Sequence, residues 1–184
     1  MSFTEEGVTT CLTFIDKSAW IDGPWKSEPD KIYWKDAETG YDCLAVRNPQ
    51  YGHWCGYVGI KEGHPAYGKH HEEVDDNISV HGGITFGDFY QEEDKEHGIC
   101  HLVSDDDKDD KVYWLGFDCA HGFDILPKYE DYLRSLVSSV KTTYTCKITE
   151  FEKAVYDRIS YKDLEFVKNE ILSLARKLKE MENE

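Results

Sequence analysis

The sequence lacks long apolar runs and is poor in basic residues. No apolar stretch approaches the ~20 residues that a membrane-spanning helix requires, so we expect no membrane partner. Lys and Arg number 21 against 37 acidic residues, for a net charge of -16. Binding along DNA or RNA needs a basic surface that neutralises phosphates, so no nucleic-acid polymer is expected as a partner. An acidic exterior still permits a small anionic ligand in a locally basic pocket.

Common metal-binding and targeting signals are also absent. The chain contains no Cys-x-x-Cys pair and no His-Glu-x-x-His motif. Its first ten residues carry Glu5 and Glu6 and no long apolar stretch, so we expect no signal peptide. The 6 cysteines are therefore expected to be reduced and mostly buried. With 184 residues and no repeat or linker, the chain predicts a single domain, 1–184.

Short segments rich in β-formers, separated by Gly, Pro, Asn and Asp, fill the first two thirds of the chain. They predict strands over residues 9–15, 31–34, 43–47, 54–60, 84–90, 99–103 and 112–117. Residues 35–40 read as the connection of a hairpin between two of these strands. The pattern predicts an α+β fold with a mostly antiparallel sheet in a motif-bearing body, residues 22–158.

The last third predicts helices. Apolar residues at helical spacing follow Pro127 up to residue 140. The closing segment, residues 160–182, predicts an amphipathic heptad helix capped by Ser160. Its apolar stripe is Leu164, Val167, Ile171, Leu174, Leu178 and Met181. Such a narrow stripe flanked by charges favours a homo-oligomer, a dimer or tetramer, although the helix could instead lie on its own sheet.

Glycine, histidine, cysteine and aromatic residues are concentrated in five motifs in the middle of the chain. These are residues 51–60 (Tyr-Gly-His-Trp-Cys-Gly-Tyr-Val-Gly-Ile), 63–69 (Gly-His-Pro-Ala-Tyr-Gly-Lys), 80–86 (Val-His-Gly-Gly-Ile-Thr-Phe), 97–101 (His-Gly-Ile-Cys-His) and 114–121 (Trp-Leu-Gly-Phe-Asp-Cys-Ala-His). Glycine lets backbone approach a ligand closely, while histidine and aromatic rings supply polar contacts and stacking faces. The motifs therefore predict a functional site.

Three kinds of chemistry compete for these motifs. Zinc has candidate ligands in His53, Cys55, His97, Cys100, His101, Cys119 and His121. No four of them have convincing spacing, so we expect neither a metal ion nor another cofactor; if zinc were bound, His97, Cys100, His101 and Cys119 would be the first ligands to test. Cys119 with His121 or His81 could form a nucleophilic pair, but Cys119 ends an apolar strand and is expected to be inert. A phosphodiesterase of the two-histidine type needs two His-x-Thr or His-x-Ser elements, and this chain contains neither copy.

A binding site fits the motifs better than these catalytic signatures. The predicted ligand-binding residues are His64, Tyr67, Lys69, His81, Thr85, Trp114 and Arg47. The His-Gly-Gly turn offers backbone N–H groups and an imidazole, the Tyr and Trp rings can stack on bases, and the cations can meet phosphate. These properties suit a nucleotide-like ligand, with no catalytic residue required.

Taken together, the motifs resemble a widespread family of small proteins from bacteriophages and prophages. The resemblance runs from about residue 23 to the C-terminus, with the segments 80–86 and 114–121 as its most specific parts. The family is in turn similar to phage anti-CBASS sponge proteins, which sequester cyclic dinucleotides without cleaving them. That resemblance implies a multimer in the host bacterial cytoplasm that takes up a cyclic dinucleotide such as a cyclic GMP-AMP.

Three functions follow from this reading. The leading expectation is a non-enzymatic immune-evasion protein that sequesters a cyclic dinucleotide. The alternative is a cytosolic phosphodiesterase or lyase that degrades a cyclic nucleotide by using His81, Asp118 and His121. The third is a phage host-takeover factor that binds no small ligand.

Overall fold

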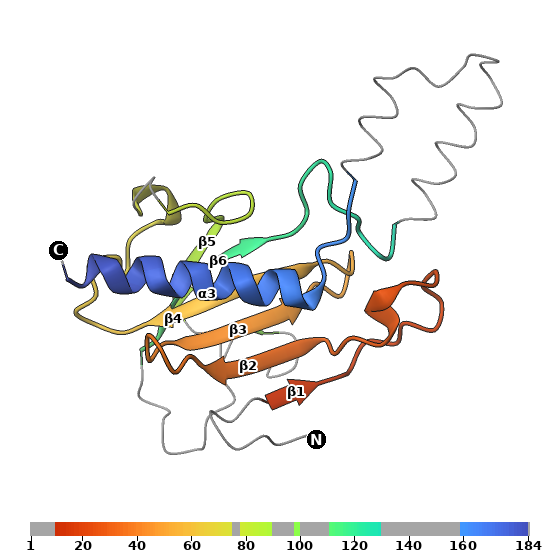
Figure 1. Cartoon of the computed structure of the whole chain (residues 1–184), viewed down its shortest axis with the longest axis horizontal. Coiled ribbons are helices and arrows are strands. Elements are labelled where there is room, and N and C mark those ends of the chain that lie inside the picture. Colours follow the sequence, from red (N-terminus) through yellow and green to blue (C-terminus); the bar gives the residue numbers. More distant parts are fainter. Residues whose placement is uncertain (1–9, 75–77, 90–97, 100–110, 130–158, 184) are drawn as a thin grey trace, which may run out of the picture.

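The computed structural model describes residues 10–74, 78–89, 98–99, 111–129 and 159–183. Six antiparallel strands form one sheet in the order β1-β2-β3-β4-β6-β5, and a long helix crosses one of its faces (Figure 1). The predicted α+β fold with a mostly antiparallel sheet is confirmed. The strands are β1 (Thr10–Leu12), β2 (Lys31–Lys35), β3 (Asp42–Arg47), β4 (Trp54–Ile60), β5 (Phe86–Phe89) and β6 (Tyr113–Asp118).

Strand predictions were accurate in the middle of the sheet. The predicted hairpin connection joins β2 to β3, with Lys35 opposite Asp42 in the register. Strand β3 is buried along its whole length because β2 and β4 flank it and both of its faces are covered. Strand β1 is shorter than predicted and lies at the sheet edge, where it pairs with β2 alone. The predicted strand over 99–103 and the predicted helix after Pro127 lie largely outside the described residues.

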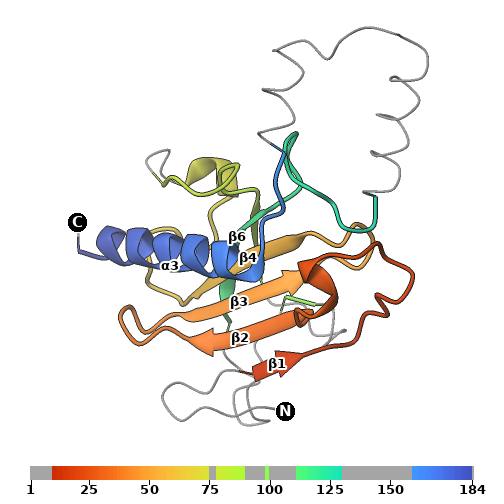
Figure 2. The same cartoon turned by 45° about the vertical axis from the view of Figure 1, so that its right-hand side comes forward.

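Helix α3 (Leu164–Met181) packs lengthwise over β3 and β4 (Figure 2). Its fully buried stripe is Val167, Ile171, Leu174, Ala175 and Leu178. Each of the larger aliphatic side chains contributes about 1.5–3 kcal/mol by leaving water. Gly56 of β4 permits the close approach, since a Cβ there would lie 2.7 Å from Cγ1 of Ile171.

The structure changes two predictions about the helix, one about its apolar stripe and one about its N-terminal cap. The stripe predicted to mediate self-association is buried against the sheet of the same chain, so it is not available to a second copy. The oligomeric state stays a prediction, without that basis. The helix is capped by Asp163, whose Oδ1 accepts a hydrogen bond from the backbone N–H of Phe166 at 2.8 Å. The predicted cap, Ser160, instead forms a parallel bridge with Asp124.

The two faces of the sheet carry separate apolar clusters. Side chains alternate along each strand, so neighbouring residues point to opposite faces. The helix-covered face includes Trp54 and Phe117 together with the α3 stripe. The other face holds a smaller cluster around Trp114 and Tyr57. Both tryptophans are fully buried, and they anchor the two faces on adjacent strands β4 and β6.

A small 3-10 helix, η1 (Pro24–Lys26), and a second one, η2 (His71–Glu73), complete the described elements. Trp25 of η1 is buried and meets the ring of Tyr161 edge-on, at 5.0 Å between ring centroids. This contact ties the N-terminal region to the segment that enters α3.

Candidate functional site

Two histidines and an aspartate come together beside the end of β6. His81 lies in a tight turn in which the N–H of Gly83 donates to the carbonyl of Val80 at 3.0 Å. His121 and Asp124 follow β6 in a turn closed by a 2.9 Å hydrogen bond from the N–H of Asp124 to the carbonyl of His121. We call His81, His121 and Asp124 the His–His–Asp cluster; their ligand atoms all lie within 4.8 Å of one another.

The carboxylate of Asp124 is the centre of this cluster. Its Oδ2 lies 2.7 Å from Nε2 of His81 and 3.4 Å from Nδ1 of His121, and it also accepts the backbone N–H of His121 at 2.9 Å. The Asp124 side chain is 2% exposed, whereas those of His81 and His121 are 21% and 36% exposed. A buried carboxylate therefore orients two imidazoles that solvent can reach.

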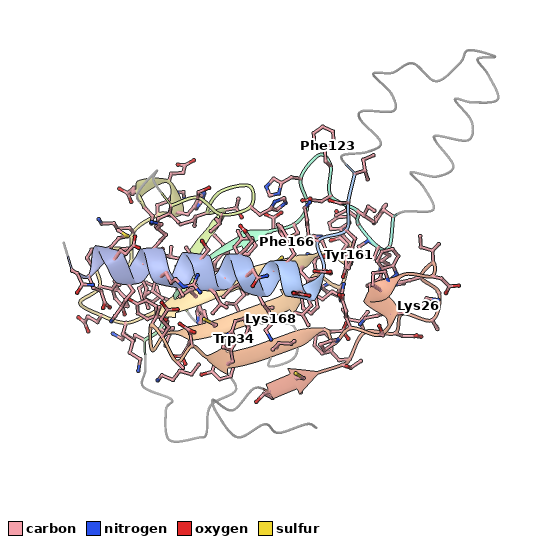
Figure 3. All side chains as sticks on the ribbon, viewed as in Figure 1. Lys26, Trp34, Phe123, Tyr161, Phe166 and Lys168 are labelled. Carbon is pink, nitrogen blue, oxygen red and sulfur yellow. The ribbon has the colours of Figure 1, made fainter. Side chains whose placement is uncertain are left out.

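The start of α3 and the segment before it support the cluster. Glu170 accepts the backbone N–H of His81 at 2.6 Å, and the Phe166 ring meets the His81 ring edge-on at 5.4 Å. Lys162 places its Nζ 3.8 Å from Oδ1 of Asp124. Figure 3 shows Phe166 near the first turns of α3 and Phe123 at the loop that follows β6. The cluster thus joins three separate parts of the chain.

Gly82 permits the His81 and His121 rings to approach each other. Its φ of 71° is in the left-handed region that favours glycine. A Cβ at this position would lie 2.0 Å from Cε1 of His121, well inside van der Waals contact. The ring centroids of the two histidines are 5.1 Å apart and nearly perpendicular. The glycine in the His-Gly-Gly motif is therefore a packing requirement of the cluster.

The structure brings together only part of the set His81, Asp118 and His121. Asp118 is the last residue of β6, where its Oδ2 accepts from the hydroxyl of Thr85 at 3.1 Å. Its other oxygen accepts the N–H of Ala120 at 2.9 Å. Asp118 thus braces the turn, while Asp124 provides the carboxylate that meets both histidines.

Three predicted ligand-binding residues are buried and make contacts within the protein. Trp114 and Arg47 have no exposed surface, so neither can stack on a base or meet a phosphate as predicted. The guanidinium of Arg47 pairs with Glu28 at 2.6 Å and donates to the carbonyl of Gly52 at 2.6 Å. His64 is also buried, with Nε2 2.9 Å from the carbonyl of Leu178 at the end of α3.

The remaining predicted residues fall into two groups. Tyr67 contacts Phe89 and Tyr113 at the start of β6, and the carbonyl of Lys69 accepts from the hydroxyl of Tyr113 at 2.5 Å. His81 and Thr85 lie toward the opposite end of β6, a strand about 16 Å long at the usual rise of ~3.3 Å per residue. The fold therefore does not bring all seven predicted residues together in one ligand-binding site.

The cysteine and histidine candidates divide in the same way. Burial strongly raises the pKa of the Cys119 thiol, so it stays protonated and is a poor nucleophile, as expected. Burial also lowers the pKa of His53, which is neutral and inaccessible. His97, Cys100 and His101 lie outside the described residues. The sequence analysis did not predict Asp124 as a functional residue. Its position three residues after His121, within one turn, is the feature that could have indicated it.

Comparisons with models of protein families, with curated proteins and with solved structures found no match. In the part of the chain that the structure describes, no helix has the length and apolar character needed to span a membrane. The cluster geometry is therefore the basis for the functional argument.

Proposed function

We propose that the protein hydrolyses a phosphoester bond of a cyclic nucleotide, with the His–His–Asp cluster as its reactive centre. One observation carries the proposal: Asp124 lies 2.7 Å and 3.4 Å from ring nitrogens of two partly exposed histidines. A carboxylate that orients an imidazole is a recurrent arrangement for activating water, either directly or through a bound ion. This is the function that we expected as the alternative, with Asp124 in place of Asp118.

The reaction needs no oxidant, reductant or second substrate. A water oxygen bonds to phosphorus, and one phosphorus–oxygen ester bond breaks. The departing ribose oxygen takes the proton that water gives up, which leaves a linear product with a terminal phosphate monoester. The cluster accepts and returns that proton, while Lys162, close to Asp124, supplies positive charge beside the phosphate.

The substrate class comes from the sequence motifs and from the surroundings of the cluster. The motif resemblance implies a cyclic nucleotide in the bacterial cytoplasm. Phe123, two residues after His121 on the loop that follows β6, is 44% exposed. Exposed aromatic rings near a reactive centre can stack on bases, which is worth about 1–3 kcal/mol per base. Figure 3 shows the Phe123 side chain projecting from this loop.

The test is turnover of a panel of cyclic mono- and dinucleotides by the full-length protein, followed by mass spectrometry of the products. Wild type is expected to yield linear nucleotides, and His121→Ala and Asp124→Asn to lower the rate at least about 100-fold. His70→Asn is the matched control, because the His70 side chain is 57% exposed and caps η2, a role that Asn can keep. Equal rates in wild type and His121→Ala would refute the proposal.

Sequestration without cleavage is the second candidate, and one observation favours it. A pocket of about 640 Å³ lies between the β2–β3 hairpin and the end of α3, and the predicted residue His64 lines it. Three lysines, Lys35, Lys61 and Lys179, line this pocket together with three carboxylates, Asp42, Glu62 and Glu182, so an anionic ligand there would meet cations that lie among acidic groups. Intact nucleotide released from heat-denatured protein, with no product, would support a sponge. A protein that neither retains nor converts any nucleotide would instead be a factor that binds no small ligand.

A further inference from the structure

We infer that His81, His121 and Asp124 bind a divalent transition-metal ion of the zinc type. No ligand spacing in the sequence led us to expect this site, because its members come from a turn before β5 and a loop after β6. Two imidazoles and a carboxylate are the donor set that zinc takes in catalytic centres, where a water fills the remaining position. The inference about binding rests on this donor set, and its catalytic meaning rests on the proposed function.

The distances from the Asp124 oxygen to the two ring nitrogens are close to those around a shared ion, and all three ligand atoms lie within 4.8 Å of one another. Around a tetrahedral zinc with bonds of ~2.0–2.1 Å, neighbouring ligand atoms are about 3.3 Å apart. Nδ1 of His121 and Oδ2 of Asp124 are 3.4 Å apart, which matches this spacing. Nε2 of His81 is 2.7 Å from the same oxygen, so that pair must open by about 0.6 Å. A change of this size requires only a small side-chain rotation, and the His81 side chain is 21% exposed.

The environment of His121 supports a ligand at this position. Its Nδ1 is buried, yet it has no hydrogen-bond partner within the described structure. A buried ring nitrogen without a partner is costly, and an ion would satisfy it. Gly82 leaves room for the ring that carries this nitrogen, since any side chain there would displace the ring. The ring lies edge-on to the His81 ring, with its Nδ1 3.4 Å from the Asp124 carboxylate.

The cluster also has the surroundings of a catalytic metal centre. A structural zinc site has four protein ligands and is closed to solvent, whereas a catalytic site keeps a position open. Here three protein ligands come together and both histidines remain partly exposed. Asp124 accepts the backbone N–H of His121, a contact of the kind that orients metal ligands. A water on such an ion has its pKa lowered to about 7, which makes it a nucleophile at neutral pH.

The inference is tested by titrating zinc into chelator-treated full-length protein and measuring the heat of binding by calorimetry. We expect one Zn²⁺ per chain, with affinity reduced about 100-fold or more in His121→Ala and Asp124→Asn and unchanged in His70→Asn. Gly82→Ala should also weaken binding, because its Cβ displaces the His121 ring although every ligand remains. Cobalt(II) in the same site should give visible d–d bands without thiolate charge transfer.

Each outcome separates the metal site from the hydrolase. Zinc binding that needs His121 but supports no nucleotide turnover would sustain the metal site and refute the proposed function. Turnover that persists after complete zinc removal, with no zinc uptake, would sustain the hydrolase and overturn the metal site. Zinc that stays in His121→Ala and is lost in Cys100→Ser would also overturn it, because the ligands would then belong to the cysteine-containing motifs. Circular dichroism of every variant confirms that it is folded.

Discussion

Replacing Glu28 with glutamine should strongly destabilise the fold, because its carboxylate accepts hydrogen bonds from several distant parts of the chain. Its Oε2 accepts from Arg47 at 2.6 Å, from the hydroxyl of Tyr161 at 2.5 Å and from the indole of Trp54 at 3.2 Å. Its Oε1 accepts the backbone N–H of Leu164, the first residue of α3, at 3.2 Å. One carboxylate thus connects the N-terminal region, two central strands and the C-terminal helix.

The charges around Glu28 set the size of the effect. Arg47 pairs with both Glu28 and Asp30, and Lys17 pairs with Asp30, so two buried cations share two carboxylates. Glu28→Gln leaves those two cations with one anion. Hydrogen bonds to charged groups contribute about 1.5–3 kcal/mol each, and breaking a buried ion pair costs about 3–5 kcal/mol. We expect a loss of about 3–5 kcal/mol, a large share of the ~5–15 kcal/mol that stabilises a typical domain.

The pH dependence gives a second measurement of the same interaction. Burial raises the pKa of Glu28. Hydrogen bonds from Tyr161, Leu164 and Arg47, together with the charge of Arg47, lower it by more than burial raises it, so the pKa lies below its ordinary value. The stabilisation is therefore present above the unfolded pKa of ~4.3 and is lost as the pH falls through the lower folded pKa. Urea unfolding from pH 7 to pH 3 should show the wild-type and Glu28→Gln curves converging.

The outcome that refutes this reasoning is equally specific. A Glu28→Gln variant within about 1 kcal/mol of wild type at pH 7 would mean that Glu28 contributes no more than a surface ion pair. A matched control is Glu38→Gln, because Glu38 pairs with Arg176 through side chains that are 64% and 52% exposed. That substitution should change stability by less than about 1 kcal/mol at any pH.

Three further predictions follow from burial. Ile171→Asp should remove cooperative unfolding in circular dichroism, at a cost above ~4 kcal/mol, because the side chain is fully buried under the sheet; a folded but smaller species in light scattering would contradict this. Trp114→Ala should cost about 3–5 kcal/mol in urea unfolding while Lys69→Ala stays within ~0.5 kcal/mol, and the reverse order would contradict the assigned burial. Cys119 should resist thiol-specific labelling at pH 8 in the native protein and react rapidly in urea, as resolved by peptide mass spectrometry, since burial raises its pKa; fast native labelling would contradict this.

Alternation and turn residues predicted the sheet well because they depend on local chemistry. Strand β4 was predicted with its observed ends, Trp54–Ile60, and the helix α3 was predicted with its apolar stripe. The stripe alone does not say which surface covers it. A heptad spacing fits a second helix and a sheet of the same chain equally well, and Gly56 is the residue that favours the sheet. Partner choice is a property of the tertiary packing, which one-dimensional spacing does not contain.

The functional site shows the same limit more strongly. His81 and Thr85 were predicted as ligand-binding residues from the His-Gly-Gly motif, and the structure places both near the end of β6, where His81 joins the His–His–Asp cluster. Arg47 and Trp114 were predicted as ligand contacts but are fully buried, because a cation and an indole occur both in ligand sites and in cores. Asp124 was missed because its partner His81 is more than 40 positions away and is brought near only by the pairing of β5 with β6.

The entry to α3 connects the stability of the protein to its site. Tyr161 donates to Glu28, whereas Lys162 of the next position faces Asp124. Phe166, in the first turn of the helix, lies edge-on to the His81 ring. Loss of the Glu28 contacts should therefore loosen the segment that carries Lys162 and Phe166 before it unfolds the sheet. In Glu28→Gln at low temperature, where the variant stays folded, we expect zinc affinity to fall along with stability. An unchanged affinity would mean that the cluster is positioned by the β6 loop and the His-Gly-Gly turn alone.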